Sequence, residues 1–183
     1  MENNADFNRF TIPLRWGLII GFVSILLFTI YSMFMMETAG MLVAGGFGVF
    51  SFILMMILLT VMAFAQRKAI GGFITFKDAF SAVFVSILIV VVMSQLYTII
   101  YTNFIDPEYY EKTLQMTQNM TIQLGVPDDA ADEAFTKAEE QIEKQKSVSG
   151  ILMSAMFQII LYSLFGFIIA AIVKRNKPEH LQA

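Results

Sequence analysis

Residues 79–104 read AFSAVFVSILIVVVMSQLYTIIYTNF, and no charged side chain interrupts them. A helix rises about 1.5 Å per residue and the hydrocarbon core of a bilayer is about 30 Å thick, so roughly 20 apolar residues can cross it. Residues 12–36, 41–65 and 150–173 have the same character, with Arg15 near the start of the first segment. Polar residues do not recur at every second position, as they do in the strands of a membrane barrel. The sequence therefore predicts four transmembrane helices.

The chain as a whole is unusually apolar. Of its 183 residues, 57% are hydrophobic and 15% are charged, whereas a soluble domain is about 45–50% apolar and about 25% charged. We expect one all-α integral membrane domain over residues 1–183, with four spans. The first segment is too long for the apolar core of a cleaved signal peptide, which has roughly 7–15 residues, so we expect it to stay in the mature protein.

Charged residues separate into two sets along the chain. The N-terminal segment, the connection between the second and third spans, and the C-terminal tail carry eight basic and four acidic residues, a net charge of +4. The remaining connections carry four basic and eleven acidic residues, a net charge of −7. Because Lys and Arg in short loops are retained in the cytosol, we expect the N and C termini to be cytosolic. The connection between the third and fourth spans then lies outside the cell or in the periplasm.

That connection, residues 106–149, is long enough to contain helices of its own. Asp106 and Pro107 favour the start of a helix, and Gly125 favours its end. The acidic residues from Asp128 onward suit the start of a second helix, because the backbone dipole favours negative charge there. We expect an extracytoplasmic antiparallel helical hairpin whose apolar stripes cover one another. Docking of a protein partner on this acidic hairpin is the alternative.

Small residues four positions apart mark helix faces that can pack closely in a membrane, where expulsion of water does not drive association. Three spans carry such pairs, which are Gly17 with Gly21, Ala44 with Gly48, and Gly166 with Ala170. We expect these faces to pack within the chain. A homo-oligomer built on the same faces is the alternative.

Four polar side chains are expected at a similar depth in the spans, namely Gln95, Gln158, Thr29 and Ser51. Counting from the ends of the spans at Phe104 and Gly150 puts both glutamines about 12–14 Å deep. An amide without a partner is costly in hydrocarbon. We therefore predict an intramembrane polar packing layer in which Gln95 and Gln158 are hydrogen-bonded across the bundle. A permeation site is the alternative use of these residues.

The loop between the second and third spans contains paired glycines, Gly71 and Gly72, which free the backbone to turn. Thr75 can cap the following helix, and Asp78 stands three residues later, close to a capping box. The simplest interpretation is a turn at the inner interface that returns the chain to the membrane. A regulatory or partner-binding loop is the alternative.

Residues able to do chemistry are scarce. The chain has no cysteine, its one histidine is His180 in the C-terminal tail, and no carboxylate, histidine or lysine lies within the bundle. An enzyme needs a nucleophile, an acid or base, or a metal site near its substrate. We therefore expect no catalytic residues, no metal and no cofactor, and a lipid bilayer rather than nucleic acid as partner. A non-catalytic binding, anchoring or modulating role follows, with a small transporter or pore-forming subunit as the alternative.

Several segments together resemble a bacterial family known only as domain of unknown function four-one-nine-nine, which is common in Bacteroidetes. The residues that carry the resemblance are Trp16–Gly21, Arg67–Lys68, Gly71–Gly72, Thr75–Phe80, Ile105–Pro107 and Ile172–Asn176, in that order. The resemblance covers nearly the whole chain. It implies four spans in a bacterial inner membrane, and it implies no activity and no site residues.

Overall fold

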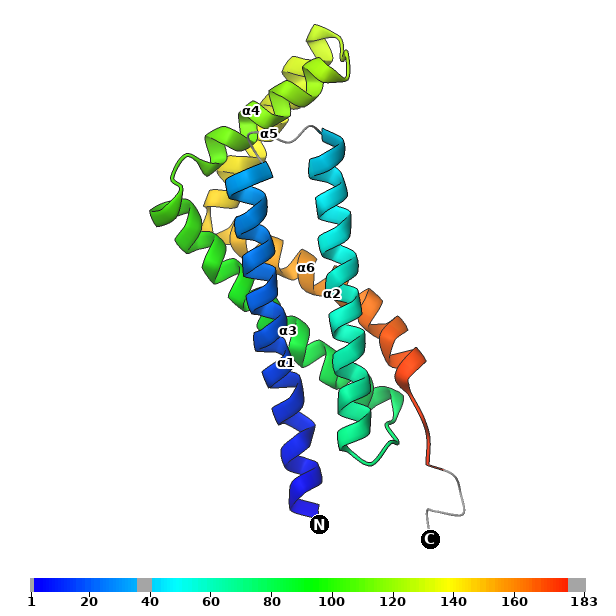
Figure 1. Ribbon diagram of the computed structural model, residues 1–183. Helices are drawn as coiled ribbons and strands as arrows, with labels where there is room; N and C mark the ends of the chain where they lie inside the picture. The colour runs from blue at the N-terminus through cyan, green and yellow to red at the C-terminus, as the bar shows by residue number, and fades with distance from the viewer. Residues whose placement is uncertain (1, 36–40, 178–183) are drawn as a thin grey trace.

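The computed structural model describes residues 2–35 and 41–177, and over these residues the protein is helical with no strand (Figure 1). The predicted link at residues 37–40 and the end of the first predicted span, Met36, lie outside the described residues. Two π-helical turns, η1 and η2, continue α1 and α3. The elements in chain order are α1 (Glu2–Ile30), η1 (Tyr31–Met35), α2 (Met41–Ala69), α3 (Phe76–Ile100), η2 (Tyr101–Ile105), α4 (Tyr109–Gln123), α5 (Asp128–Lys146) and α6 (Val148–Val173).

Four stretches of helix are long and apolar enough to cross a membrane: Phe10–Phe34, Val43–Ala69, Phe76–Ile105 and Val148–Val173. Their bounds agree with the predicted segments to within a few residues. The start of α1, the α2–α3 loop and the end of α6 lie at one end of the molecule, and α4 and α5 lie at the other (Figure 1). We call these the basic end, after Arg67, Lys68, Lys77, Lys174 and Arg175, and the α4–α5 end.

Helix α3 is the centre of the bundle, because α1 and α6 both pack mainly against it. Glycines permit these contacts. A Cβ atom on Gly17 would lie 3.0 Å from Ile89 Cβ, one on Gly21 would lie 2.6 Å from Met93 Sδ, and one on Gly166 would lie 3.3 Å from Val83 Cγ1. Ala170, one turn beyond Gly166, is fully buried. Both glycine faces therefore pack inside the chain.

Of the two small residues predicted to form a packing face in α2, Ala44 and Gly48, only Ala44 is packed. That residue is buried, but Gly48 is exposed, and no atom lies within 4 Å of the position its Cβ would take.

Pro13 lies inside α1, which begins at Glu2. The proline removes one backbone N–H from the helix. Its own carbonyl accepts a hydrogen bond from Ser86 Oγ at 2.9 Å, and both residues are buried at the α1–α3 contact. Tertiary packing at this contact outweighs the local preference of proline for a helix start.

Helices α4 and α5 pack against each other. Gly125, with φ of +63°, follows the end of α4 as expected. The predicted cap at Asp106 is wrong, since α4 begins only at Tyr109. Residues 106–109 form a turn in which Tyr109 N–H donates to the Asp106 carbonyl at 3.1 Å. The Asp106 carboxylate instead pairs with Lys112 at 3.1 Å.

At the basic end, the α2–α3 loop is fixed to the segment after α6. Gly71 and Gly72 have φ of +94° and +85°, which explains the paired glycines. Thr75 caps α3 as expected, because its hydroxyl accepts from Asp78 N–H at 3.2 Å. Ile74 exchanges two backbone hydrogen bonds with Arg175, each of 2.9 Å. The loop and the segment after α6 are therefore held together at this end.

Candidate functional site: polar cavities between α1, α3 and α6

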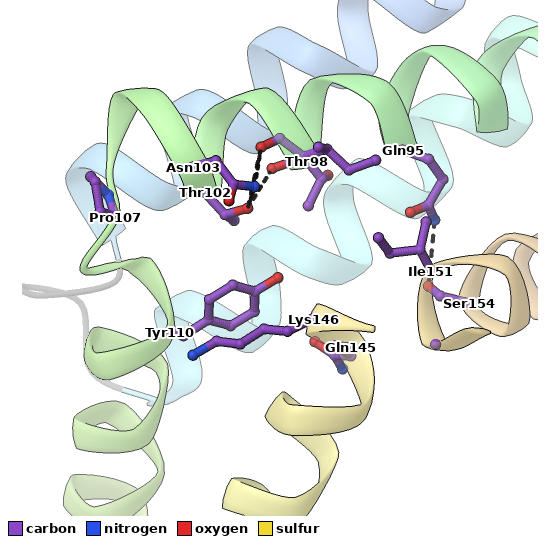
Figure 2. A pocket seen from close by; sticks show the side chains of 12 residues that line it. Gln95, Thr98, Thr102, Asn103, Pro107, Tyr110, Gln145, Lys146, Ile151 and Ser154 are labelled. Carbon is purple, nitrogen blue, oxygen red and sulfur yellow. Dashed lines mark hydrogen bonds between the residues drawn. The ribbon is translucent and has the colours of Figure 1, made fainter. Parts of the chain in front are cut away.

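A cavity of about 590 Å³ opens at the α4–α5 end, where α3, the start of α4, the end of α5 and the start of α6 meet (Figure 2). One wall comes from α3 and the turn that follows it. The opposite wall comes from α4, α5 and α6. We call it the first cavity, and its lining is Gln95, Thr98, Ile99, Thr102, Asn103, Pro107, Tyr110, Gln145, Lys146, Gly150, Ile151 and Ser154.

The α3 wall presents oxygen atoms that can accept hydrogen bonds. Thr98 Oγ1 donates to the Ser94 carbonyl at 2.9 Å, and Thr102 Oγ1 donates to the Thr98 carbonyl at 2.9 Å. Asn103 Nδ2 donates to the Ile99 carbonyl at 2.8 Å. Since the hydroxyl protons are already used, Thr98 Oγ1 and the amide oxygen of Asn103 remain as acceptors. Thr102 Oγ1 already accepts from Asn103 Nδ2 at 3.5 Å and keeps one further lone pair.

The opposite wall supplies the positive charge of the site. Lys146, the last residue of α5, is the one charged residue in the described lining of the first cavity. Its Nζ lies 4.9 Å from the centre of the Tyr110 ring, and the two side chains lie along each other in Figure 2. This contact holds the ammonium over an aromatic face at the cavity wall.

A close turn between α5 and α6 sets the position of this wall. Ser147 caps α6 by accepting from Gly150 N–H at 3.1 Å. A Cβ on Gly150 would overlap the carbonyl of Lys144, so only glycine allows the start of α6 to lie this close to the end of α5. Lys146 and Ser154 thus face the same space.

A second cavity of about 450 Å³ continues from the first and shares Gln95, Thr98 and Ser154 with it. Gln95 Nε2 and Gln158 Nε2 each donate to Ser154 Oγ at 3.4 Å. The two amides therefore line one cavity. They meet at Ser154, whose hydroxyl oxygen accepts from both, whereas the prediction had them bonded to each other.

A third cavity of about 390 Å³ shares Ser24, Phe28 and Tyr162 with the second and lies between α1 and α2. It is mostly apolar, and Ser51 is one of its few polar residues. Ser51 Oγ is buried and has no hydrogen-bond partner among the described residues. The other lining residues of the third cavity are Leu27, Tyr31, Phe47, Gly48, Phe52 and Met55.

Thr29 belongs to a different contact from the other three predicted layer residues. Its hydroxyl donates to the Ile25 carbonyl at 2.8 Å and lies 2.7 Å from the Tyr97 hydroxyl. Tyr97 lines the second cavity, but Thr29 lines none of the three. Gln95, Gln158 and Ser51 therefore line the connected cavities, and Thr29 lies beside them through its contact with Tyr97.

The sequence of the chain places it in a family. A model of the family described as "Protein of unknown function (DUF4199)" matches residues 15–175. The chain belongs to the DUF4199 family. No curated protein and no solved structure matches it. Because the family description names no activity, the three cavities carry the functional argument for this DUF4199 protein.

An aromatic cluster ties the α4–α5 pair of the DUF4199 chain to the bundle. The Tyr109 ring lies 5.7 Å from Phe28 of α1 and 6.0 Å from Tyr101, and Phe28 also contacts Tyr97. Burial raises the pKa of Tyr109 to about 12, since it disfavours the phenolate. The cluster holds the start of α4 beside the cavities.

Several residues of the DUF4199 site were not identified from the sequence, above all Ser154, Tyr110 and Lys146. A signal for part of the site was present. Ser154, Gln158 and Tyr162 recur every four residues on α6, so they lie on one face. Lys146 and Tyr110 carry no comparable pattern, because they approach α3 only through the fold of the α4–α5 pair.

The site of this DUF4199 protein offers hydrogen bonding, one cation and apolar surface. Within residues 2–35 and 41–177, no group of three or more His, Cys, Asp or Glu side chains could hold a metal ion. Hydroxyl groups are present, but among the described residues no histidine or carboxylate lines any of the three cavities to activate them. This arrangement suits recognition of a bound molecule.

Proposed function

We propose that this DUF4199 protein is a non-catalytic, four-span protein of the bacterial inner membrane that binds a ligand in the connected cavities near its α4–α5 end. The observation that carries the proposal is the continuity of the three cavities. The second cavity shares lining residues with the first and also with the third. Ligand sites in helical bundles are built from side chains on facing helices in this way. Binding, anchoring or modulation are the roles that such a site can serve.

Insertion into a membrane is supported by what the helices expose. Large apolar side chains point outward along all four candidate spans, for example Phe22 at 58%, Ile53 at 51%, Val92 at 55% and Ile160 at 58% exposure. Exposed apolar area on this scale requires an apolar solvent. Alkaline carbonate should leave the protein in the pellet of a membrane preparation, and release into the supernatant would contradict the proposal.

Orientation follows from charge. The basic end carries Arg67, Lys68, Lys77, Lys174 and Arg175, so we assign it to the cytosol together with both termini, and we assign the α4–α5 hairpin to the periplasm. A periplasm-dependent reporter inserted after Gly125 should be active, and the same reporter fused after Ala183 should be inactive. The reverse pattern would overturn the orientation.

Closure of the bundle toward the basic end favours binding over a continuous pore. Ile20, Leu59, Met62, Val83 and Ile87 are almost fully buried there and form one apolar core. A solute in the second cavity would have to displace this core to reach the cytosol. Transport remains the second candidate, because a cavity open at one end is also what one state of a carrier presents.

Two measurements separate these candidates. The purified full chain, reconstituted in liposomes, should show no flux of ions or small polar solutes above that of empty liposomes. Purification in mild detergent should instead retain a bound molecule or an envelope protein, the latter through the acidic hairpin. Flux through the purified chain alone would replace the binding proposal with transport.

A further inference from the structure

We propose that the three cavities bind one glycerophospholipid of the outer leaflet, with a phosphoethanolamine-type headgroup in the first cavity and an acyl chain in the third. This inference rests on the proposed function, because it requires the α4–α5 end to lie on the periplasmic side of a bilayer. It names the chemical class of the ligand that the cavities select.

The chemistry of the cavities changes in the same order as that of such a lipid. The first cavity is lined by a cation, amides and hydroxyls, and the second by amides and hydroxyls mixed with apolar side chains. The third is lined mainly by Leu27, Phe28, Phe47, Phe52 and Met55. A phospholipid likewise passes from a charged headgroup through ester groups to an acyl chain.

The two walls of the first cavity select the two ends of the headgroup. Lys146 can pair with a phosphate, and it meets no acidic side chain in the described lining. The α3 wall presents the Thr98, Thr102 and Asn103 oxygens, which can accept hydrogen bonds from an ammonium N–H. A primary ammonium fits this wall, but a trimethylated one does not, because it has no N–H to donate.

The amides that line the second cavity lie where the ester groups of the bound lipid would lie. Gln95 Nε2 and Gln158 Nε2 each carry two N–H donors, and each uses one on Ser154. The second N–H of either amide can donate to an ester carbonyl. A ligand that supplies such acceptors removes the cost of an unsatisfied donor in an apolar surrounding.

A lipid can enter from the side of the bundle. Helices α1 and α6 both pack on α3 but not as a pair with each other, and the second cavity lies between them and α3. Ser24, Ile25 and Phe28 of α1 face Ser154, Gln158 and Tyr162 of α6 across it. The third cavity continues from there to the side between α1 and α2, where its lining residue Gly48 is exposed, so an acyl chain can reach it from the bilayer.

The test measures lipid binding to the purified, delipidated full chain in mild detergent by native mass spectrometry. Four probes are compared: phosphatidylethanolamine, phosphatidylcholine with the same acyl chains, diacylglycerol with the same acyl chains, and free phosphoethanolamine. Phosphatidylethanolamine should bind at least fivefold more tightly than the other two lipids. Free phosphoethanolamine should not displace it at a hundredfold excess.

Variants locate the site. Lys146→Gln should weaken phosphatidylethanolamine binding about fivefold, the effect of one cation near a membrane surface. Lys137→Gln removes an equal charge from an exposed position on α5, where Lys137 pairs with Glu133, and it should leave binding unchanged. Ser154→Leu should weaken binding about tenfold because Ser154 lines both the first and second cavities, whereas Ser81→Leu on the exposed side of α3 should not.

The outcomes separate this inference from the proposed function. Equal affinity for all three lipids, or equal loss with Lys137→Gln and Lys146→Gln, would overturn the lipid assignment while leaving a membrane protein with a binding cavity. Tight binding of free phosphoethanolamine would identify a soluble ligand in its place. If Ser154→Leu fails to fold, the lipid preference of the unmodified chain still decides the question. Release by carbonate would overturn both proposals.

Discussion

The contact between α1 and α3 predicts that one substitution, glycine to alanine, has opposite effects at two positions. In Gly17→Ala the new Cβ would lie 2.9 Å from Ile89 Cδ1 and 3.0 Å from Ile89 Cβ. Isoleucine is branched at Cβ and stiff, so the two helices must move apart. Overpacking of this kind costs about 1–3 kcal/mol, and the better helix propensity of alanine offsets about 0.5–1 kcal/mol. We expect a net loss of about 1–2 kcal/mol.

The matched control is Gly48→Ala in α2. No atom lies within 4 Å of the new Cβ, so only the gain in helix propensity remains. We expect Gly48→Ala to stabilise the protein by about 0.5–1 kcal/mol. Gly21→Ala should fall between the two, because its closest neighbour is the flexible end of Met93.

Reversible unfolding of the detergent-solubilised protein in sodium dodecyl sulfate, followed by far-ultraviolet circular dichroism, measures these differences. The helical signal is preferred to fluorescence, since the single tryptophan, Trp16, is the neighbour of Gly17. The reasoning is refuted if Gly17→Ala is at least as stable as the unmodified protein. It is also refuted if Gly17→Ala and Gly48→Ala shift the midpoint in the same direction by similar amounts.

Three further predictions concern the caps and the base of the α4–α5 pair. Thr75→Ala should lower the free energy of unfolding by about 1 kcal/mol, because it removes the hydroxyl that caps α3. Thr75→Ser keeps that hydroxyl and should therefore retain most of the stability. The pKa of Tyr109 is about 12 in the folded protein and about 10 in the unfolded chain, so ionisation favours unfolding between these pH values. Stability should fall there by about 1.4 kcal/mol per pH unit more than in Tyr109→Phe, and identical profiles would exclude a buried Tyr109. Gly150→Ala should separate the start of α6 from the Lys144 carbonyl, seen as faster trypsin cleavage after Lys144 and Lys146 than in Ser149→Ala.

The spans could be predicted from the sequence because their cause is local. A run of apolar residues must form a helix in hydrocarbon whatever its neighbours do, since its backbone groups have no other partners there. The glycine faces at Gly17 and Gly166 could be predicted for a similar reason, since a missing side chain marks a close approach. The partner of each face, α3 in both cases, could not be derived from spacing.

The cavities depend on tertiary arrangement, and here sequence reasoning found parts of the site without its geometry. Counting residues from the span ends placed Gln95 and Gln158 at the same depth in the membrane. It did not identify Ser154 as the residue whose hydroxyl oxygen accepts from both. It also grouped Thr29 with them, although Thr29 contacts the Tyr97 hydroxyl and is not among the lining residues of the three cavities. Depth along a span is a sequence property, whereas the direction of a side chain around its helix depends on how the helices are rotated.

One face of α6 shows how core and cavities arise together. Every fourth residue from Ser154 reads Ser154, Gln158, Tyr162, Gly166 and Ala170, so the face is polar toward the α4–α5 end and small toward the basic end. The small residues let α6 approach α3 closely, as Gly166 does at Val83. The longer side chains, which need space, lie where the helices diverge.

Helix α1 likewise carries small residues toward the basic end and large ones toward the α4–α5 end, and this explains how the helices stay separated at the α4–α5 end. Gly17 and Gly21 contact α3, whereas Phe28, two to three turns further on, packs against Tyr101 and Tyr109 with ring centres 5.3 and 5.7 Å away. Rings in place of glycines hold the helices apart at the α4–α5 end. The space they leave is lined by polar groups, and an empty polar space among apolar helices costs free energy. Water or the headgroup of a ligand can satisfy these groups, and the preference among lipid headgroups in the binding test distinguishes the two.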